Sequence, residues 1–117
     1  MVADDFVRRA LLAVHKAVLA AERKHLEQVH GSLSSAAFLQ VVSDPVRYGW
    51  LQPLSRLILA YEEDEEERAP EEELLARMRD LLLPPQQKTP FGRRYLSLMQ
   101  REPALVLAHA ELAKLLR

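Results

Sequence analysis

Two Glu-x-x-His motifs lie close together in the first third of the chain, Glu22 with His25 and Glu27 with His30. Residues three apart share one face of a helix, and ferritin-like bundles bind paired metal ions with glutamate and histidine at this spacing. Those bundles take their motifs from different helices and add single glutamates from two others, whereas both motifs here are expected on one helix. Spacing alone is therefore a weak signal for a metal site.

His25 and His109 are each expected on the apolar stripe of a helix. A histidine on such a stripe is usually a neutral core residue with one hydrogen bond. If the first and last helices pack together, however, the two rings could approach each other and share a metal ion, a small ligand or a response to pH. Together with Glu22 they form the alternative hypothesis, a helical bundle that binds a metal ion or a small ligand.

The corner from Asp44 to Ser55 contains two prolines and the only tryptophan of the chain. If this corner has a structural role, we expect a rigid turn in which Asp44 caps a helix and Trp50 anchors a joint between helices. If the corner has a binding role, we expect Arg47, Tyr48 and Trp50 to form a recognition surface, because these residue types dominate binding hot spots. Both interpretations stay open.

Few residues of the chain suit catalysis. The sequence has no cysteine, which excludes thiol chemistry, disulfides and cysteine zinc sites. None of its three glycines belongs to a recognisable phosphate loop or nucleophile elbow. Gly92, next to Arg93 and Arg94 at a predicted helix start, could hold an anion, but a single glycine is a weak signal. We therefore expect no enzyme activity, no catalytic residues and no cofactor.

Charge is unevenly distributed along the sequence. Between Glu62 and Glu73 there are nine acids and one base, whereas the rest of the chain carries 15 bases and eight acids. Such a segment, with Glu65, Glu66 and Glu67 at its centre, could bind a basic partner or the body of a second copy. The simpler interpretation is a solvated junction between two helices. The bases occur singly or in pairs without exposed aromatic residues between them, so nucleic-acid binding is not expected.

The composition predicts an all-α protein. Leucine and alanine make up 37 of the 117 residues, against 11 for isoleucine, valine and threonine together, which favours helices over strands. We expect a single domain over residues 1–117, an irregular bundle of four main helices plus one or two short helices. The first helix, capped by Asp4 and ended by Gly31, would be its spine. A second helix, capped by Ser32 or Ser34, is apolar nearly all round, as for a buried helix. Further helix starts or ends are marked by Pro45, Pro53, Pro70, Pro84, Pro90 and Pro103.

Three stretches of the sequence, taken in this order, form a pattern that resembles known proteins. They are Glu22-Arg23 to His30-Gly31, Asp44-Pro45 to Trp50-Leu51-Gln52-Pro53-Leu54-Ser55, and Phe91 through Tyr95, Gln100 and Pro103 to His109. Together they resemble a family of small, uncharacterised bacterial helical proteins with a Trp-Leu-x-Pro-Leu-Ser motif, which is the most specific part of the match.

The sequence departs from that family at two places. His25 stands where a tyrosine is expected, and Arg47-Tyr48-Gly49 where more apolar residues are expected. The first departure puts a required metal ligand at His25 in doubt. The resemblance implies a bacterial, cytoplasmic protein of this fold and brings no activity.

The leading hypothesis is a non-catalytic helical module for protein–protein interaction or regulation. It would bind a protein partner or associate with itself, for example as a homodimer. The longest uncharged stretch, residues 31–43, is far shorter than the roughly 20 apolar residues of a membrane span. The first five residues contain two acids, where a secretion signal would carry bases. We therefore expect a cytoplasmic protein that contacts neither a membrane nor nucleic acid.

Overall fold

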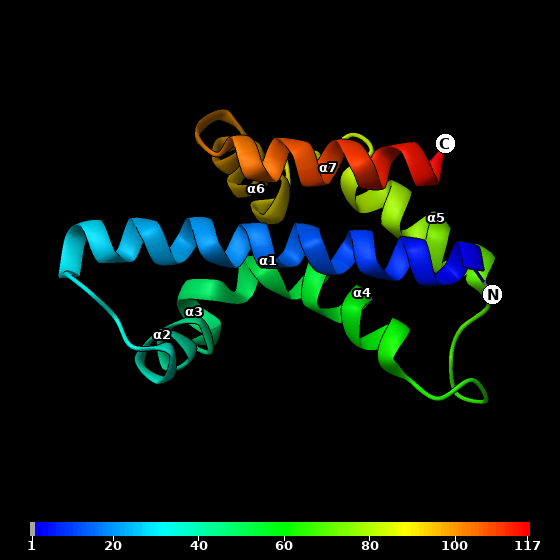
Figure 1. Cartoon of the computed structure of the whole chain (residues 1–117), viewed down its shortest axis with the longest axis horizontal. Coiled ribbons are helices and arrows are strands. Elements are labelled where there is room, and N and C mark those ends of the chain that lie inside the picture. Colours follow the sequence, from blue (N-terminus) through cyan, green and yellow to red (C-terminus); the bar gives the residue numbers. More distant parts are fainter. Residues whose placement is uncertain (1) are drawn as a thin grey trace.

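The helix α1 (Val2–His30) is the spine of the molecule (Figure 1). In this computed structural model, which describes residues 2–117 and the side chains from residue 5 onward, α1 has 29 residues, or about 43 Å at 1.5 Å per residue. It ends as predicted at Gly31, whose φ of +84° is the left-handed conformation that terminates many helices. It begins before Asp4, so the prediction that Asp4 is its N-cap is wrong.

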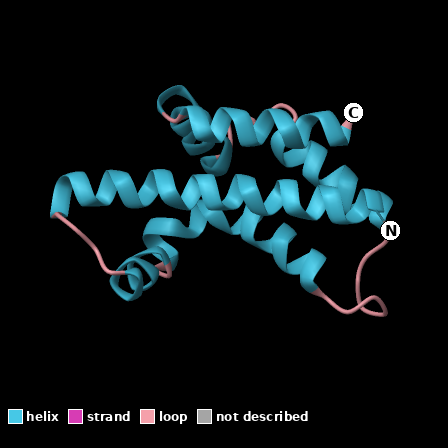
Figure 2. Ribbon diagram, viewed as in Figure 1, coloured by secondary structure: helices cyan, strands magenta, loops and turns pink. Residues whose placement is uncertain are grey.

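The remaining described elements are also helical, and no strand occurs among residues 2–117 (Figure 2). In chain order they are α2 (Ser35–Val42), α3 (Pro45–Tyr48), the 3₁₀ turn η1 (Gly49–Leu51), α4 (Gln52–Glu62), α5 (Glu71–Leu82), α6 (Pro90–Arg101) and α7 (Pro103–Leu116). The all-α prediction is confirmed. The helices of 11 or more residues in this part of the chain number five, where the sequence predicts four main helices.

The helices pack on both sides of α1. α7 runs alongside α1 in the opposite direction and, with α6, lies on one side of it, whereas α2, α3 and α4 lie on the other (Figure 1). α5 packs against α4 near the start of α1. None of the described helices combines the length and the apolar character that crossing a membrane requires.

One large core joins α1, η1, α4, α5, α6 and α7. Its largest fully buried side chains are Tyr61, Tyr95, Phe91, Leu11, Leu54, Leu74, Met78, Leu82, Leu98, Leu105, Leu112 and Leu116. A second, small cluster of Leu26, Phe38 and Tyr48 forms where the end of α1 meets α2 and α3. Trp50 packs against both clusters. It therefore anchors the joint between helices, which is the structural role expected for it.

Several predicted helix caps are present. The side chain of Ser34 accepts a hydrogen bond from the Ala37 amide at 3.1 Å, and that of Asp44 accepts one from the Val46 amide at 2.9 Å. The prediction that the second helix is buried is wrong, because Phe38 is its one buried residue and Leu39 is 59% exposed. α2 lies at the edge of the molecule, where only one of its faces has a neighbour.

Gly92 has a packing role. A β-carbon at this position would lie 1.8 Å from the backbone oxygen of Gln86, so no other residue fits without a backbone shift. The Gly92 amide donates a hydrogen bond to the Thr89 hydroxyl, which caps α6, at 2.9 Å. Because the glycine is buried and its amide is engaged, this amide is not available to an anion.

Candidate functional site

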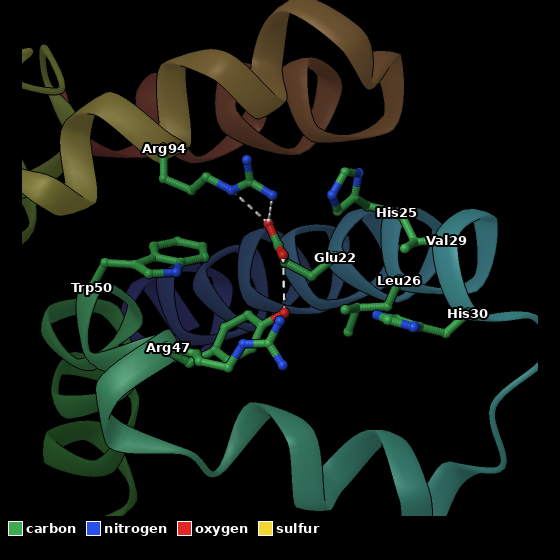
Figure 3. Close-up of a pocket in the computed structure, with 9 residues that line it drawn as sticks. Glu22, His25, Leu26, Val29, His30, Arg47, Trp50 and Arg94 are labelled. Carbon is green, nitrogen blue, oxygen red and sulfur yellow. Dashed lines mark hydrogen bonds and ion pairs between the residues drawn. The ribbon is translucent and has the colours of Figure 1, made fainter.

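A pocket of about 270 Å³ opens at the C-terminal end of α1, beside α3, η1 and α6 (Figure 3). Its lining consists of Glu22, His25, Leu26, Val29, His30, Arg47, Tyr48, Trp50 and Arg94. The structure thus brings together six residues from two separate parts of the sequence, positions 22, 25 and 30 of the Glu-x-x-His motifs and positions 47, 48 and 50 of the corner. We call this the α1-end pocket.

A buried carboxylate lies at the centre of the pocket. Glu22 is 2% exposed and is the only buried charged or polar residue among those whose side chains are described. Nε of Arg94 donates a hydrogen bond to its Oε1 at 2.7 Å, and Nη2 of the same guanidinium forms an ion pair with Oε1 at 2.6 Å. The hydroxyl of Tyr48 donates to Oε2 at 3.3 Å. Because both carboxylate oxygens are engaged, Glu22 joins α6 and α3 to α1.

Tyr48 keeps its proton in this arrangement. Burial raises the pKa of its hydroxyl above the ordinary value, and the negative charge of Glu22 and the hydrogen bond to it raise it further. Arg47 and Arg94 act in the opposite direction and lower the pKa. The net result is a phenol that stays neutral and can donate to Glu22 over the physiological pH range.

Three basic side chains around the pocket make no hydrogen bond or ion pair with any described residue. They are Arg47, His25 and His30, and all three are exposed. In Figure 3, His25 and His30 come from α1 and Arg47 from α3, on different sides of the Glu22 carboxylate. Because Glu22 neutralises the charge of Arg94, the guanidinium of Arg47 gives the pocket a net positive charge.

The expectation that His25 is a core residue is wrong. The buried face of α1 passes from Val18 through Glu22 to Leu26, because α2 and α3 cover the last turns of the helix from that side. His25 precedes Leu26 by one residue and therefore points about 100° away from it. It lies at the rim of the pocket.

His109 lies elsewhere. Its Nδ1 is 2.8 Å from the Tyr95 hydroxyl, with the two ring centroids 5.5 Å apart. Burial lowers the pKa of His109 and raises that of Tyr95, so the pair is a neutral imidazole and a neutral phenol. His109 is half-buried, as a satisfied core histidine would be, and does not line the α1-end pocket.

The residues of the metal hypothesis do not assemble into a binding group. No three histidine, aspartate or glutamate side chains of the described chain come together in a way that could hold a metal ion. Glu22 is bound by Arg94 and Tyr48, while His109 is bound by Tyr95. The grouping of Glu22, His25 and His109 predicted as the alternative site is therefore not formed.

An aromatic row connects the pocket to His109. Ring centroids are 6.2 Å apart between Tyr48 and Trp50, 6.4 Å between Trp50 and Phe91, and 5.2 Å between Phe91 and Tyr95. These spacings are within the range of favourable aromatic contacts. The row packs α3 and η1 against α6, so these three elements build the pocket wall together.

The acidic segment lies away from the pocket. Glu65, Glu66 and Glu67 are exposed in the connection between α4 and α5. Glu62, which starts this run, accepts a hydrogen bond from Arg8 at 3.0 Å, near the beginning of α1. The segment and the α1-end pocket are therefore at opposite ends of the spine.

The sequence did not indicate that Arg94 is the principal partner of Glu22. The two residues are 72 positions apart, so no local spacing connects them. The one available signal is that Glu22 lies beside the apolar position Ala21 on a long helix, where a charged residue needs a partner if the helix is covered.

No family model matches the sequence, and neither a curated protein nor a solved structure shows significant similarity to it.

Proposed function

We propose that the protein is a non-catalytic helical interaction module and that the α1-end pocket is its recognition surface. The pocket would receive an acidic side chain of a protein partner together with a neighbouring apolar side chain. The observation that carries this proposal is the position of Arg47. Its side chain is exposed beside the pocket and has no partner among the described residues, whereas Glu22 and Arg94 neutralise each other.

The chemistry of the lining supports an acidic and apolar occupant. Arg47 can bind a carboxylate with two parallel hydrogen bonds, and the rings of His25 and His30 can add a donor each. Leu26, Val29 and Trp50 supply an apolar wall, with Val29 64% exposed. Tryptophan and arginine are the residue types that most often dominate the binding energy of protein interfaces.

The size of the pocket favours side chains over a cofactor. Pockets for small molecules usually enclose roughly 300–1,000 Å³, and this one has about 270 Å³. That volume suits one or two protruding side chains of a partner. The hypothesis of a bundle that binds a metal ion or ligand through core histidines has less support, because His25 is exposed and His109 is bonded to Tyr95.

The biological setting belongs to the same proposal. The resemblance to small bacterial helical proteins around the Trp-Leu-x-Pro-Leu-Ser motif supports a bacterial, cytoplasmic module of that family. In the structure this motif forms η1 and the start of α4, and its tryptophan lines the pocket.

A selection from a random peptide library tests the proposal. Peptides are selected on the wild-type protein and then tested on Arg47→Glu and on Lys88→Glu. Lys88 is also exposed and without a partner among the described residues, but it lies in the turn before α6. We expect enriched peptides to combine acidic and apolar residues and to lose at least roughly tenfold in affinity on Arg47→Glu, because like charges oppose each other. Equal binding to all three proteins would refute the proposal.

A further inference from the structure

The acidic segment and the α1-end pocket have complementary charges but cannot meet within one chain. Glu62, at the start of the segment, is held by Arg8, whereas the pocket begins at Glu22. On α1, Arg8 and Glu22 are fourteen positions apart, which is about 21 Å along a straight helix. Charges this far apart are almost fully screened at physiological salt, where the Debye length is roughly 8 Å. The two charges therefore do not compensate each other within one chain.

The acidic side chains are presented on an ordered turn. The amides of Glu67 and Arg68 donate to the Asp64 carbonyl at 2.9 and 2.8 Å, and a guanidinium nitrogen of Arg68 donates to the Glu63 carbonyl at 3.1 Å. The carboxylates of Glu65, Glu66 and Glu67 form no ion pair with any other described side chain. Their backbone is thus ordered while their carboxylates are free to bind, which lowers the backbone entropy that docking would cost.

One wall of the pocket, formed by α3, and the acidic segment lie on the same side of α1, whereas Arg94 of α6 forms the opposite wall of the pocket. α2 and α3, which flank the pocket, and the connection after α4, which carries the acids, project from that side at opposite ends of the spine (Figure 1). α4 runs between them. A two-fold axis through the middle of this side would bring the acidic segment of each copy to the pocket of the other, as in a closed isologous dimer.

The exposed face of α4 would lie near that axis. Leu54, Leu57 and Tyr61 of α4 are buried in the core, whereas Leu59 on the other face is 64% exposed. Val46 of α3, beside the pocket, is 91% exposed. In the dimer these apolar side chains would be covered by the second copy, so the interface would have an apolar centre between two charged ends.

We propose that the occupant of the α1-end pocket is the acidic segment of a second copy of this chain, in a two-fold symmetric dimer. This inference rests on the proposed function, since it requires a pocket that binds acidic segments. It adds the identity of the partner: Glu65, Glu66 and Glu67 of one copy bind around Arg47 of the other.

Exchange of the two charges tests the dimer. One variant carries Glu65→Lys, Glu66→Lys and Glu67→Lys, and the other carries Arg47→Glu. In each variant alone, both contacts of the symmetric dimer would join like charges. In a one-to-one mixture, the lysine segment of the first meets the altered pocket of the second, and the native acidic segment of the second meets the native pocket of the first. Both contacts are again attractive.

Sedimentation velocity measures the result. At about 0.01 M salt, where the Debye length is roughly 30 Å, we expect the 13.4 kDa wild-type chain to sediment as a dimer. At about 1 M salt, where it is roughly 3 Å, we expect the fraction of dimer to fall. Each variant alone should raise the dimer dissociation constant by roughly a hundredfold or more, because juxtaposed like charges are strongly unfavourable. The mixture should restore the dimer, and Lys88→Glu should leave it unchanged.

Three outcomes would overturn the inference: a wild-type monomer at low salt, dimers that persist in both variants, and variants that dissociate but do not recombine in the mixture. If Arg47→Glu fails to fold by circular dichroism, His30→Glu at the pocket rim replaces it in the same mixture. A wild-type monomer would remove only the second copy as partner. Failure of the peptide selection would instead remove the recognition role of the pocket itself.

Discussion

Arg94 binds one carboxylate oxygen of Glu22 through two nitrogens, a hydrogen bond from Nε at 2.7 Å and an ion pair with Nη2 at 2.6 Å. The carboxylate is almost completely buried, whereas the arginine side chain is 30% exposed. This asymmetry matters, because removing the arginine would leave a charge in the protein interior, while removing the carboxylate would leave a cation that can reach water.

The two partners of this ion pair should therefore differ in their contribution to stability. We expect Arg94→Ala to lower the free energy of unfolding by about 3 kcal/mol, because it strands the buried carboxylate. Glu22→Gln should cost less, about 1–2 kcal/mol, because the amide oxygen can still accept a hydrogen bond from Arg94 while the amide NH2 can donate to the Tyr48 hydroxyl oxygen. Urea denaturation monitored by circular dichroism measures both values.

The double variant and a neighbouring arginine supply the controls. In the presence of Glu22→Gln, Arg94→Ala should cost at least about 1 kcal/mol less than it does alone, since no buried charge is left behind. Arg93, which is exposed on the same helix, should tolerate replacement by alanine within about 0.5 kcal/mol. Equal costs for Arg94→Ala in both backgrounds would show that the ion pair is not what stabilises this region.

Local signals in the sequence predicted most of the fold. Gly31 ends α1, Ser34 and Asp44 cap the helices that follow them, and Pro90 and Pro103 open α6 and α7. Each of these effects acts within a few residues and needs no knowledge of the tertiary structure.

The errors arose where tertiary contacts decide the outcome. The apolar stripe expected on the first helix predicts a buried His25, but α2 and α3 cover the end of α1 from another direction and bury Leu26 instead. An apolar composition predicts a buried α2, yet the helix has a neighbour on only one face. The pocket itself could be predicted only as separate pieces, because Glu22 and Arg94 are joined across 72 positions.

Gly92 and Gly49 offer a matched pair of substitutions. A β-carbon at position 92 would lie 1.8 Å from the Gln86 backbone oxygen, whereas one at position 49 would meet nothing within 4 Å. We expect Gly92→Ala to lower the free energy of unfolding by about 3 kcal/mol through overpacking. Gly49→Ala, in a helical conformation, should be neutral or slightly stabilising. Thermal melting compares them, and similar melting temperatures for the two variants would contradict the close packing at Gly92.

Arg23 fastens α2 to the end of α1. Its guanidinium donates to the Leu33 carbonyl at 2.5 Å and lies 5.7 Å from the ring centre of Phe38. We expect Arg23→Ala to lower the free energy of unfolding by about 1 kcal/mol and to speed amide hydrogen exchange in α2 before it does so in α7. Lys24→Ala, on the next and more exposed side chain, should leave exchange in α2 unchanged. Uniformly faster exchange would instead indicate a global loss of stability.

His109 and His15 should make stability depend on pH. Burial lowers the pKa of both side chains below the ordinary value of 6.5. As the pH falls below about 6.5, the unfolded chain therefore takes up protons that the folded protein still excludes, and the free energy of unfolding decreases. The two histidines therefore contribute their full stabilising effect above about pH 6.5. This contribution is lost as the pH falls to their lower pKa in the folded protein.

Replacement of His109 by a residue that does not titrate isolates its share of this dependence. Glutamine can also form a hydrogen bond with the Tyr95 hydroxyl, which stays protonated because burial raises the pKa of Tyr95. Urea denaturation between roughly pH 7.5 and pH 5 should show a shallower loss of stability for His109→Gln than for the wild type, and the shallowest for His109→Gln combined with His15→Gln. A slope for His109→Gln that equals the wild-type slope would mean that His109 is protonated equally in the folded and unfolded chains. The bond to Tyr95 would then not depend on a neutral imidazole.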